Sequence, residues 1–555
     1  MTKFCFPLLL VLIVKAQTPA APPPSSAASL EGKTLNADGK PARKCAVSLR
    51  RSADLDKQPK AYTTLSSAEG TFSFSEIEQG EYQLWAQCAG CLTMIYGASH
   101  GYTLGARLSI TDGQHLKDLT FKLIPESIIT GKIVDEDDDP FSPRCSVVAW
   151  KPTLREGTRG FEPAGWATTG RDGEFRIAGL APGKYYLSSA TDRTVSWASQ
   201  GAGSVEAYGT TYYPSSPALE LAAQVDIREG QEVNGLKIRM RRSAVRHVRG
   251  KVLSQVPDLV PSRVRASLWL AHQNADTAST FLKFQDDSGV LSQDWRFDLS
   301  ATEPGAYYLL VADSRNPIRP LGRAVIQVAA SDIENLTVPV FPPAKVRGVV
   351  RFDKSDEQGA TKPPSVKGVM IRLRAADSLV INPPSASAGG DGTFILDDVG
   401  VGSYQIAVRQ LPAGTYLKSV RMGGDEVTGR AVTINGGDLI EVIVSADAAQ
   451  IGGTVEDDQN HRVPRAVVVL TPEPPRLEQG HLYQTTTTNE NGEFSFQNLG
   501  PGAYSVRAWE DMDTSAGLQY DPDLTRLSQN RGAAITIGEN DMRQVQLLVI
   551  PADRQ

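Results

Sequence analysis

Histidines and short catalytic motifs are the features of this sequence with the most direct link to chemistry. A zinc peptidase site needs a His and a Glu close together in sequence, plus a distant His, to hold the metal. None of the six histidines has Glu three residues later, and they are scattered along the chain: His100, His115, His247, His272, His461 and His481. We therefore predict no catalytic residue, no metal site and no bound cofactor.

Two further stretches fit chemical motifs by sequence alone. Gly97–Gly101 matches G-x-S-x-G, but that motif works on a strand-to-helix turn, and the following YTLGARLSI indicates loop and strand. The run Asp135–Asp139 offers alternate carboxylates for Ca²⁺, but Pro140 stands where a calcium loop needs glycine. We interpret the first match as chance and the second as a solvated acidic turn.

The cysteines are the remaining reactive side chains. Cys45, Cys88, Cys91 and Cys145 follow an N-terminal segment that we interpret below as a signal peptide, so disulfide bonding is expected. Cys45 and Cys88 could cross-link strands of one module, which leaves Cys91 and Cys145 to pair across a module boundary or to stay as thiols. The alternative is a Cys88–Cys91 redox pair, but such pairs depend on a helix N-terminus, and none is predicted here.

The elements that would position these residues follow from one stretch, Asp172–Tyr185 (DGEFRIAGLAPGKY), which recurs five times. Each copy carries a Phe ten residues before a Tyr: Phe72 and Tyr82, Phe175 and Tyr185, Phe297 and Tyr307, Phe394 and Tyr404, Phe494 and Tyr504. A glycine stands two residues before each Tyr, where we expect a positive φ or a close backbone approach. The alternation of Phe175 with Ile177, and of Tyr185 with Leu187, predicts a hairpin with one buried face.

Each copy has the same surroundings. A Gly-centred strand opens the module, at Gly32, Gly131, Gly250, Gly348 and Gly453. Apolar, β-branched strands follow at 45–50, 145–150, 265–270, 369–374 and 466–471. Closing strands are expected at 116–123, 233–240, 333–340, 439–445 and 543–550. About seven strands in roughly 100 residues is the pattern of an Ig-like sandwich.

The third copy departs from the pattern. Trp295 replaces the turn glycine, and Thr302 replaces the apolar residue that should plug the end of the sandwich. We expect a variant turn there within the same fold.

The xG-x-V opening with DGxFxFxxLxPGxYxLxA resembles the carboxypeptidase regulatory-like domain, a transthyretin-like β-sandwich. The resemblance extends over residues 27–552 and implies a string of exported accessory modules. It implies carbohydrate binding only by analogy with related starch-binding-like folds. The peptidase itself is not part of the resemblance.

Bulk properties agree with an exported all-β chain. Residues 4–14 are an apolar run too short to span a bilayer, and 14–16 resembles a small-residue cleavage site. The net charge of −6 becomes −8 without Lys3 and Lys15, which disfavours nucleic-acid binding. We predict five tandem Ig-like β-sandwich domains: 1–16 signal peptide, 17–28 Pro/Ser/Ala-rich tether, and sandwiches at 29–125, 126–242, 243–342, 343–447 and 448–555. Short linkers imply a semi-rigid string of beads.

The longest module adds aromatic residues after its hairpin, within 190–217. These residues are Trp197, Tyr208, Tyr212 and Tyr213. On exposed loops they could stack on sugars or anchor a protein partner. The alternative, that they close the edge of the sandwich, is favoured by the usual burial of large rings.

The sequence therefore predicts a non-enzymatic, monomeric, exported binding or scaffold protein without a membrane span after signal cleavage. Its partner would be carbohydrate or a cell-surface or outer-membrane protein. The alternatives are a structural spacer, a periplasmic accessory subunit of an outer-membrane system, and, less favoured, a hydrolase with an unrecognised site.

Overall fold

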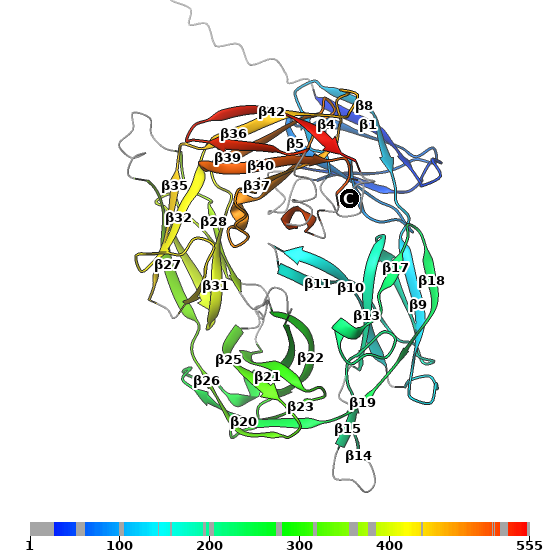
Figure 1. The fold of residues 1–555 in the computed structure, drawn as a ribbon, viewed down its shortest axis with the longest axis vertical. Helices are drawn as coiled ribbons and strands as arrows, with labels where there is room; N and C mark the ends of the chain where they lie inside the picture. Colours follow the sequence, from blue (N-terminus) through cyan, green and yellow to red (C-terminus); the bar gives the residue numbers. More distant parts are fainter. Residues whose placement is uncertain are drawn as a thin grey trace, which may run out of the picture.

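The computed structural model describes residues 27–51, 61–98, 105–142, 144–155, 158–191, 196–198, 205–273, 280–314, 319–353, 364–375, 384–434, 437–512, 514, 517–521 and 531–551. The predicted signal peptide and most of the tether lie outside these residues. Within them the chain forms five β-sandwiches in sequence (Figure 1). The predicted fold class is confirmed, while the residue boundaries between sandwiches stay a prediction.

Module 1 pairs a sheet of order β4-β1-β8 with one of order β3-β2-β5-β6, to which β7 adds through β5. Its strands are β1 (Ala28–Leu35), β2 (Ala46–Arg51), β3 (Ala61–Leu65), β4 (Thr71–Ile77), β5 (Gly80–Gln87), β6 (Met94–Ile95), β7 (Leu108–Ile110) and β8 (His115–Lys122). The opening strand β1 is antiparallel to β4 and parallel to the closing strand β8.

Module 2 repeats this arrangement with β12-β9-β18 against β11-β10-β13-β16. Its elements are β9 (Ser127–Val134), β10 (Cys145–Arg155), β11 (Thr158–Thr168), β12 (Glu174–Leu180), β13 (Gly183–Thr191), β14 (Ser196–Ala198), β15 (Val205–Tyr208), β16 (Thr211–Tyr212), η2 (Leu219–Leu221), β17 (Val225–Ile227), β18 (Glu232–Arg239) and β19 (Arg242–Ala244). Strands β14, β15 and β19 form a small extra sheet at the junction with module 3.

Module 3 pairs β23-β20-β26 with β22-β21-β24-β25. Its elements are β20 (Arg246–Ser254), η3 (Pro261–Arg263), β21 (Val264–Gln273), β22 (Thr280–Val290), β23 (Arg296–Ala301), β24 (Gly305–Asp313), β25 (Arg319–Val328) and β26 (Ile333–Val340).

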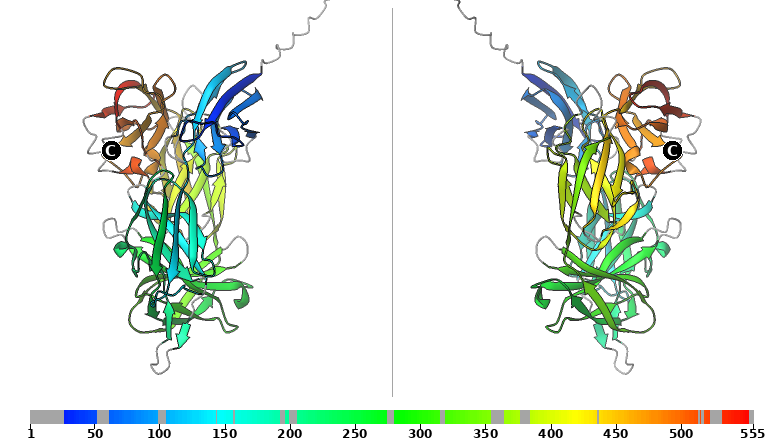
Figure 2. Two further views of the ribbon diagram at one scale, coloured as in Figure 1. Left: turned by 90° about the vertical axis from the view of Figure 1, so that its right-hand side faces the viewer. Right: turned by 90° about the vertical axis from the view of Figure 1, so that its left-hand side faces the viewer.

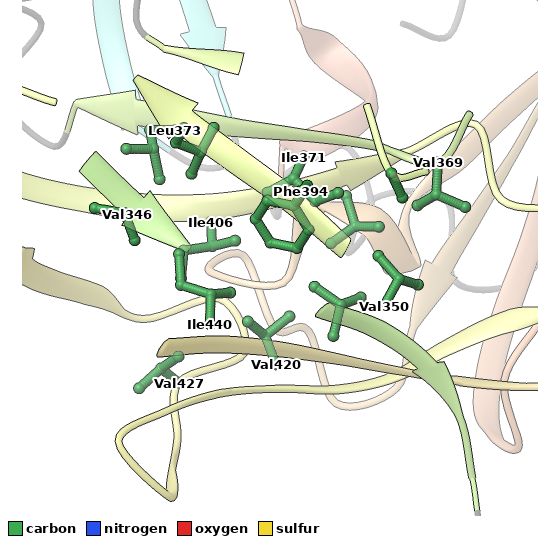
Figure 3. Packing of buried hydrophobic residues seen from close by; sticks show 14 of the residues in the cluster. Val346, Val350, Val369, Ile371, Leu373, Phe394, Ile406, Val420, Val427 and Ile440 are labelled. Carbon is green, nitrogen blue, oxygen red and sulfur yellow. The ribbon is translucent and has the colours of Figure 1, made fainter. Parts of the chain in front are cut away.

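Module 4 adds β32 and β33 to the sheet that holds its opening strand. Its strands are β27 (Ala344–Phe352), β28 (Met370–Ala375), β29 (Ser385–Ser387), β30 (Thr393–Val399), β31 (Gly402–Arg409), β32 (Tyr416–Met422), β33 (Asp425–Glu426), β34 (Ala431–Ile434) and β35 (Leu439–Ser445). Figure 3 shows its core, where side chains from the two sheets, such as Ile371 and Val420, converge on Phe394.

In module 5 the two sheets join through β40 and β42 into one continuous sheet. Its elements are β36 (Ala449–Glu456), β37 (Val467–Pro472), η4 (Gly480–Leu482), β38 (Gln484–Thr487), β39 (Glu493–Leu499), β40 (Gly502–Trp509), η6 (Leu518–Tyr520), β41 (Ala533–Ile537) and β42 (Met542–Ile550).

The opening glycine of every module lies beneath the Phe of the repeat. A Cβ placed on Gly348 would lie 2.1 Å from the ring of Phe394 and 2.7 Å from the carbonyl oxygen of Ile440 on the closing strand. Equivalent contacts below 3 Å join Gly32 to Phe72, Gly131 to Phe175, Gly250 to Phe297 and Gly453 to Phe494. The absence of a side chain therefore lets the ring pack directly on the backbone where the opening strand meets the closing strand.

The Tyr of the repeat ties the hairpin to its own turn. All five rings are almost fully buried, and each hydroxyl donates to the carbonyl oxygen four residues earlier, at Glu78, Ala181, Glu303, Gly400 and Gly500. The hydroxyl oxygen, the one polar atom of the side chain, therefore keeps a hydrogen-bond partner when the ring is buried. The arrangement resembles the tyrosine corner of Ig-like domains.

The variant turn expected in module 3 is absent at Trp295 but present next to Thr302, where β20 pairs with β23 without the register shift that the equivalent strand pairs of the other four modules have. Trp295 adopts φ 65°, close to the φ 70° of Gly173, and its carbonyl accepts from Val252 N–H as the carbonyl of Gly173 accepts from Ile133 N–H. Thr302 is buried like the apolar plugs of the other modules. The turn is thus kept although a left-handed φ is strained for a tryptophan.

The five modules close into a ring instead of a string of beads. Figure 1 shows the first and last modules meeting at the top, and Figure 2 shows them side by side from both flanks. Thr487 Oγ1 in module 5 donates to the carbonyl oxygen of Gly105 in module 1 at 3.4 Å. Module 5 also reaches module 2, because Gly517 packs against the carbonyl of Leu154 at the end of β10.

The modules share one orientation within the ring. In modules 2 to 5 the sheet that carries the opening strand lies on the outside, while strands of the other sheet, such as β10, β21, β31 and β40, lie toward the centre (Figure 1). Residues that alternate outward from those inner strands therefore face a shared central region.

The first prediction concerns the glycine beneath the Phe ring. Gly348→Ala should destabilise module 4 by about 1–3 kcal/mol because the methyl group overlaps Phe394 and the closing strand. Hydrogen exchange of the β27 amides measures this within a multidomain chain. Gly390→Ala is the control, because a Cβ there meets open space. Equal protection of β27 in both variants would contradict the steric explanation.

The second prediction concerns ring closure. A Cβ on Gly517 would lie 1.6 Å from Leu154 O, so Gly517→Ala should expose amides of 150–155 and 517–521 to faster hydrogen exchange. Gly423→Ala places alanine at a similarly positive φ with nothing nearby, which controls for backbone strain. Unchanged exchange in both segments would show that this contact does not hold modules 2 and 5 together.

Candidate binding site

The aromatic residues predicted from the sequence close the edge of module 2. Tyr208 is 7% exposed and Tyr212 is 1% exposed. The Tyr208 ring meets Phe141 edge-on, and its hydroxyl donates to Glu136 Oε2 at 2.9 Å and accepts from Arg242 Nε at 3.0 Å. Burial raises the pKa of Tyr208. The favoured alternative, in which large rings close the edge of the sandwich, is therefore confirmed for Tyr208 and Tyr212, and these two rings are not exposed for stacking.

The other two predicted rings have different positions. Tyr213 is half-buried against the core of module 2. Trp197 lies on β14, but its side chain is outside the described residues. The structure therefore does not bring the four rings together as one exposed platform.

A second set of rings lies on the inner face of modules 2 and 3. Trp150 is the cross-strand partner of Tyr186, and Trp269 is the cross-strand partner of Tyr308. Both indoles donate to a serine on the same sheet, Trp150 to Ser188 Oγ at 2.8 Å and Trp269 to Ser267 Oγ at 3.0 Å. The same Trp–Tyr pair thus occurs at the equivalent position of two adjacent modules, with each indole held in place by a hydrogen bond.

Trp166 extends this set in module 2. It lies on β11 and is the cross-strand partner of Val148, two residues from Trp150, and its side chain is 72% exposed. Phe161 on the same strand packs edge-on against Tyr186, with ring centroids 5.3 Å apart. We define Trp150, Trp166, Tyr186 and Phe161 as the aromatic face of module 2.

Sequence reasoning missed this face although a signal was present. In CSVVAW and RASLWL the tryptophan alternates with the buried residues of its strand, so it must point away from the core. The residue after each repeat Tyr, Tyr186 or Tyr308, points the same way. Reading the outward positions as carefully as the core positions would have found both pairs.

A cleft lies between modules 4 and 5, with a volume of about 320 Å³. Strand β31 of module 4 provides one wall with Gln405 and Arg409, next to Arg374 of β28. Segment 480–484, residues 498–500 and Tyr504 of β40 in module 5 provide the other wall. Tyr416 and Glu539, which are hydrogen-bonded at 2.9 Å, link the two modules.

The module 5 wall of this cleft is uncharged apart from Glu478. Tyr483 and Tyr520 pack with ring centroids 5.2 Å apart, and burial raises the pKa of Tyr483 to about 12. His481 keeps contact with solvent, but the protein around it and then Arg476 lower its pKa to about 4. Both side chains are therefore neutral at pH 7.

The cysteines show one disulfide. Cys45 and Cys88 are bonded, with Cα atoms 4.4 Å apart, which confirms the cross-link predicted within module 1. It also excludes a Cys88–Cys91 pair in this structure. Cys91 and Cys145 carry thiols, Cys145 in the core of module 2, and burial followed by Glu126 raises the pKa of Cys91.

The acidic run forms a hydrogen-bonded turn with nearby cations. Asp135 Oδ1 accepts from the N–H groups of Asp137 and Asp139, both at 3.0 Å. Asp138 pairs with Lys237 at 3.4 Å and with Arg239 at 2.8 Å. The carboxylates thus serve the turn and its ion pairs, as expected of a structural turn.

The described residues do not test the G-x-S-x-G match at 97–101. Ser99, His100 and Gly101 lie outside the described residues, as does the side chain of His272. Among the described residues, no three His, Cys, Asp or Glu side chains lie close enough together to hold a metal ion. In the same residues, no helix is long and apolar enough to cross a membrane.

Comparison with known proteins identifies the last module. Residues 450–519 match the carboxypeptidase regulatory-like domain. The resemblance stated from the repeat is thus confirmed for this part of module 5, and the other four modules share its β-sandwich fold and its Gly–Phe contact. No curated protein matches the chain.

Solved structures show only distant likeness. The Bacillus anthracis TIE protein is 12% identical, with 77% of this chain and 74% of that protein covered and a TM-score of 0.16. The Streptococcus agalactiae minor pilin GBS52 is 15% identical over 38% and 94% of the two chains, with a TM-score of 0.21. The Bacillus cereus major pilin BcpA is 10% identical over 95% and 99%, with a TM-score of 0.14. Such low TM-scores say nothing about the role of this chain.

The third prediction concerns His481. Its lowered pKa means that between about pH 4 and 6.5 the unfolded chain takes up a proton that the folded chain does not, so stability falls as pH falls through this window. An NMR titration should show the His481 ring protonating near pH 4, with the His481→Asn variant used to assign its signal. A midpoint near 6.5 would show that neither the surrounding protein nor Arg476 lowers the pKa of His481.

Proposed function

We propose that this chain is a non-enzymatic exported scaffold that binds carbohydrate on the inner faces of its modules. The observation that supports it is the Trp–Tyr pair at the same cross-strand position in two neighbouring modules, with Trp166 exposed beside one of them. A flat indole held in one orientation suits the C–H face of a sugar ring. Because few side-chain rotamers are lost on binding, the entropic cost of binding is low.

The two platforms belong to adjacent modules, so they suit a chain of sugars better than a single sugar. Trp150 and Tyr186 present one platform, and Trp269 and Tyr308 present the next, both on strands that face the centre of the ring. Weak stacking at each platform adds up when one ligand reaches both. This arrangement favours an oligosaccharide or polysaccharide ligand.

The same proposal gives the aromatic face no catalytic role. A glycosidase needs two carboxyl groups facing one another across the substrate. The aromatic face of module 2 is built from Trp150, Phe161, Trp166 and Tyr186, and none of these can act as such a pair. We propose that the chain is a monomer, since its ring closes within a single chain through Thr487 and Gly105.

The fourth prediction tests this function. Neutral oligosaccharides of glucose or mannose, screened by glycan array and then by calorimetry, should include a ligand whose affinity falls about tenfold in Trp166→Ala, since one lost stacking contact is worth about 1.4 kcal/mol. Met542→Ala is the control, because that side chain is equally exposed, at 75%, on the outer strand β42. If no glycan binds, the structural-spacer alternative replaces this proposal.

A further inference from the structure

Arg507 on β40 is the only arginine that is buried in the described part of the chain, where it is 5% exposed. Strand alternation sets its direction. Val506 and Ala508 point into the core of module 5, so Arg507 points to the opposite face of the sheet. A charged side chain that is buried on this face requires a partner of opposite charge.

The Arg507 guanidinium has no such partner within the described chain. None of its nitrogens makes a hydrogen bond or an ion pair with a described residue, and Nε is fully enclosed. Burial lowers the pKa of Arg507 and outweighs the attraction of Glu473, which is exposed. Because arginine keeps its proton in proteins, a positive charge is buried here without a described counter-ion.

A neighbouring arginine shows the usual arrangement. Arg531 Nη1 donates to the carbonyl oxygen of Val549 at 2.6 Å, and Nη2 donates to Asp458 Oδ2 at 3.1 Å. Asp458 is therefore already paired, and the charge of Arg507 stays uncompensated.

The groups packed around Arg507 are small and uncharged. Its cross-strand partner on β37 is Val469, and the next outward pair along the same two strands is Thr471 and Ser505. Gly532 lies over the side chain, since a Cβ there would be 2.9 Å from Arg507 Cγ and 3.0 Å from Nε. In the described chain Nε is the one enclosed nitrogen of the guanidinium, so Nη1 and Nη2 remain available to a ligand.

We propose that Arg507 binds a small oxyanion through Nη1 and Nη2. Two N–H groups of one guanidinium match two oxygens of a single phosphate, sulfate or carboxylate group, so one side chain is sufficient for the contact. Because only 5% of Arg507 is exposed, the ligand is a small ion and not a polymer. This inference goes beyond carbohydrate binding and does not depend on it.

Oxyanion binding would stabilise the segment that closes the ring. Trp509, two residues after Arg507, packs against Leu518 on the same face of β40. Gly517, next to Leu518, contacts Leu154 of module 2. A bound anion that compensates the charge of Arg507 is therefore expected to protect β40 and η6 together.

The test is hydrogen exchange of the full chain in sodium phosphate, sodium sulfate, sodium acetate and, at the same ionic strength, sodium chloride. A ligand that binds only the folded state raises protection by the factor 1 + [L]/Kd. Amides of β40 should therefore exchange about tenfold more slowly at an oxyanion concentration ten times its Kd. Chloride offers no pair of oxygens and should leave exchange unchanged. Phosphate and sulfate compared with acetate decide whether the site takes a tetrahedral oxyanion or a carboxylate.

The variants locate the site. Arg507→Met removes the charge and keeps an unbranched side chain, so oxyanions should no longer slow exchange of β40. Arg507→Lys keeps the charge but lacks the planar pair of donors, so it should bind the oxyanion more weakly than the wild type. Arg543→Gln is the matched control, because it removes an exposed arginine from the outer strand β42 of the same module and should respond to oxyanions as the wild type does. If the Met variant does not fold, the wild type and the Lys variant still decide the question.

Three outcomes overturn the proposal. Equal exchange of β40 in chloride and in all three oxyanions would refute the site, as would an oxyanion effect that persists in Arg507→Met. Equal slowing of β24 in module 3 would show only the general effect of salts that are excluded from the protein surface. Better protection of Arg507→Met than of the wild type in every buffer would show a buried unpaired charge that binds no ligand.

Discussion

The contact between a bare glycine and a phenylalanine ring supports every module of this chain. The opening strand pairs with the hairpin on one side and with the closing strand on the other, and Gly348 lies where Phe394 crosses it. The ring covers the backbone of both neighbours at that point, and its burial is worth about 1.5–3 kcal/mol. Any side chain at the glycine would separate the strands, so the first, middle and last segments of a module depend on this one contact.

This constraint assigns the repeated side chains to the core of each module. The Phe and Tyr rings of the repeat are buried in the core, and the Tyr hydroxyl donates a hydrogen bond to a carbonyl of its own turn. What remains variable is the outward residue beside each Tyr, which is Gln83, Tyr186, Tyr308, Gln405 or Ser505. Its partner across the strand is Arg50, Trp150, Trp269, Arg374 or Thr471. The shared scaffold thus carries one variable residue pair per module, and in module 5 this pair, Thr471 and Ser505, is buried.

Because the modules close into a ring, those outward positions face one shared central region. If the modules formed an open string, their inner sheets would face separate regions of solvent. The contacts of Thr487 with Gly105 and of Gly517 with Leu154 instead bring the ends of the chain together. The hydrogen bond from the Tyr416 hydroxyl to Glu539 links modules 4 and 5 beside the cleft between them.

The sequence by itself determined the sandwich fold and the core residues of each hairpin. These depend on period-two alternation and on glycine spacing, which are local and repeat five times. Tertiary structure alone decided that Trp295 keeps the glycine turn, that Cys45 pairs with Cys88, and that the modules form a ring. Those outcomes depend on contacts between residues far apart in sequence, such as Leu154 with Gly517, and no local pattern encodes such contacts.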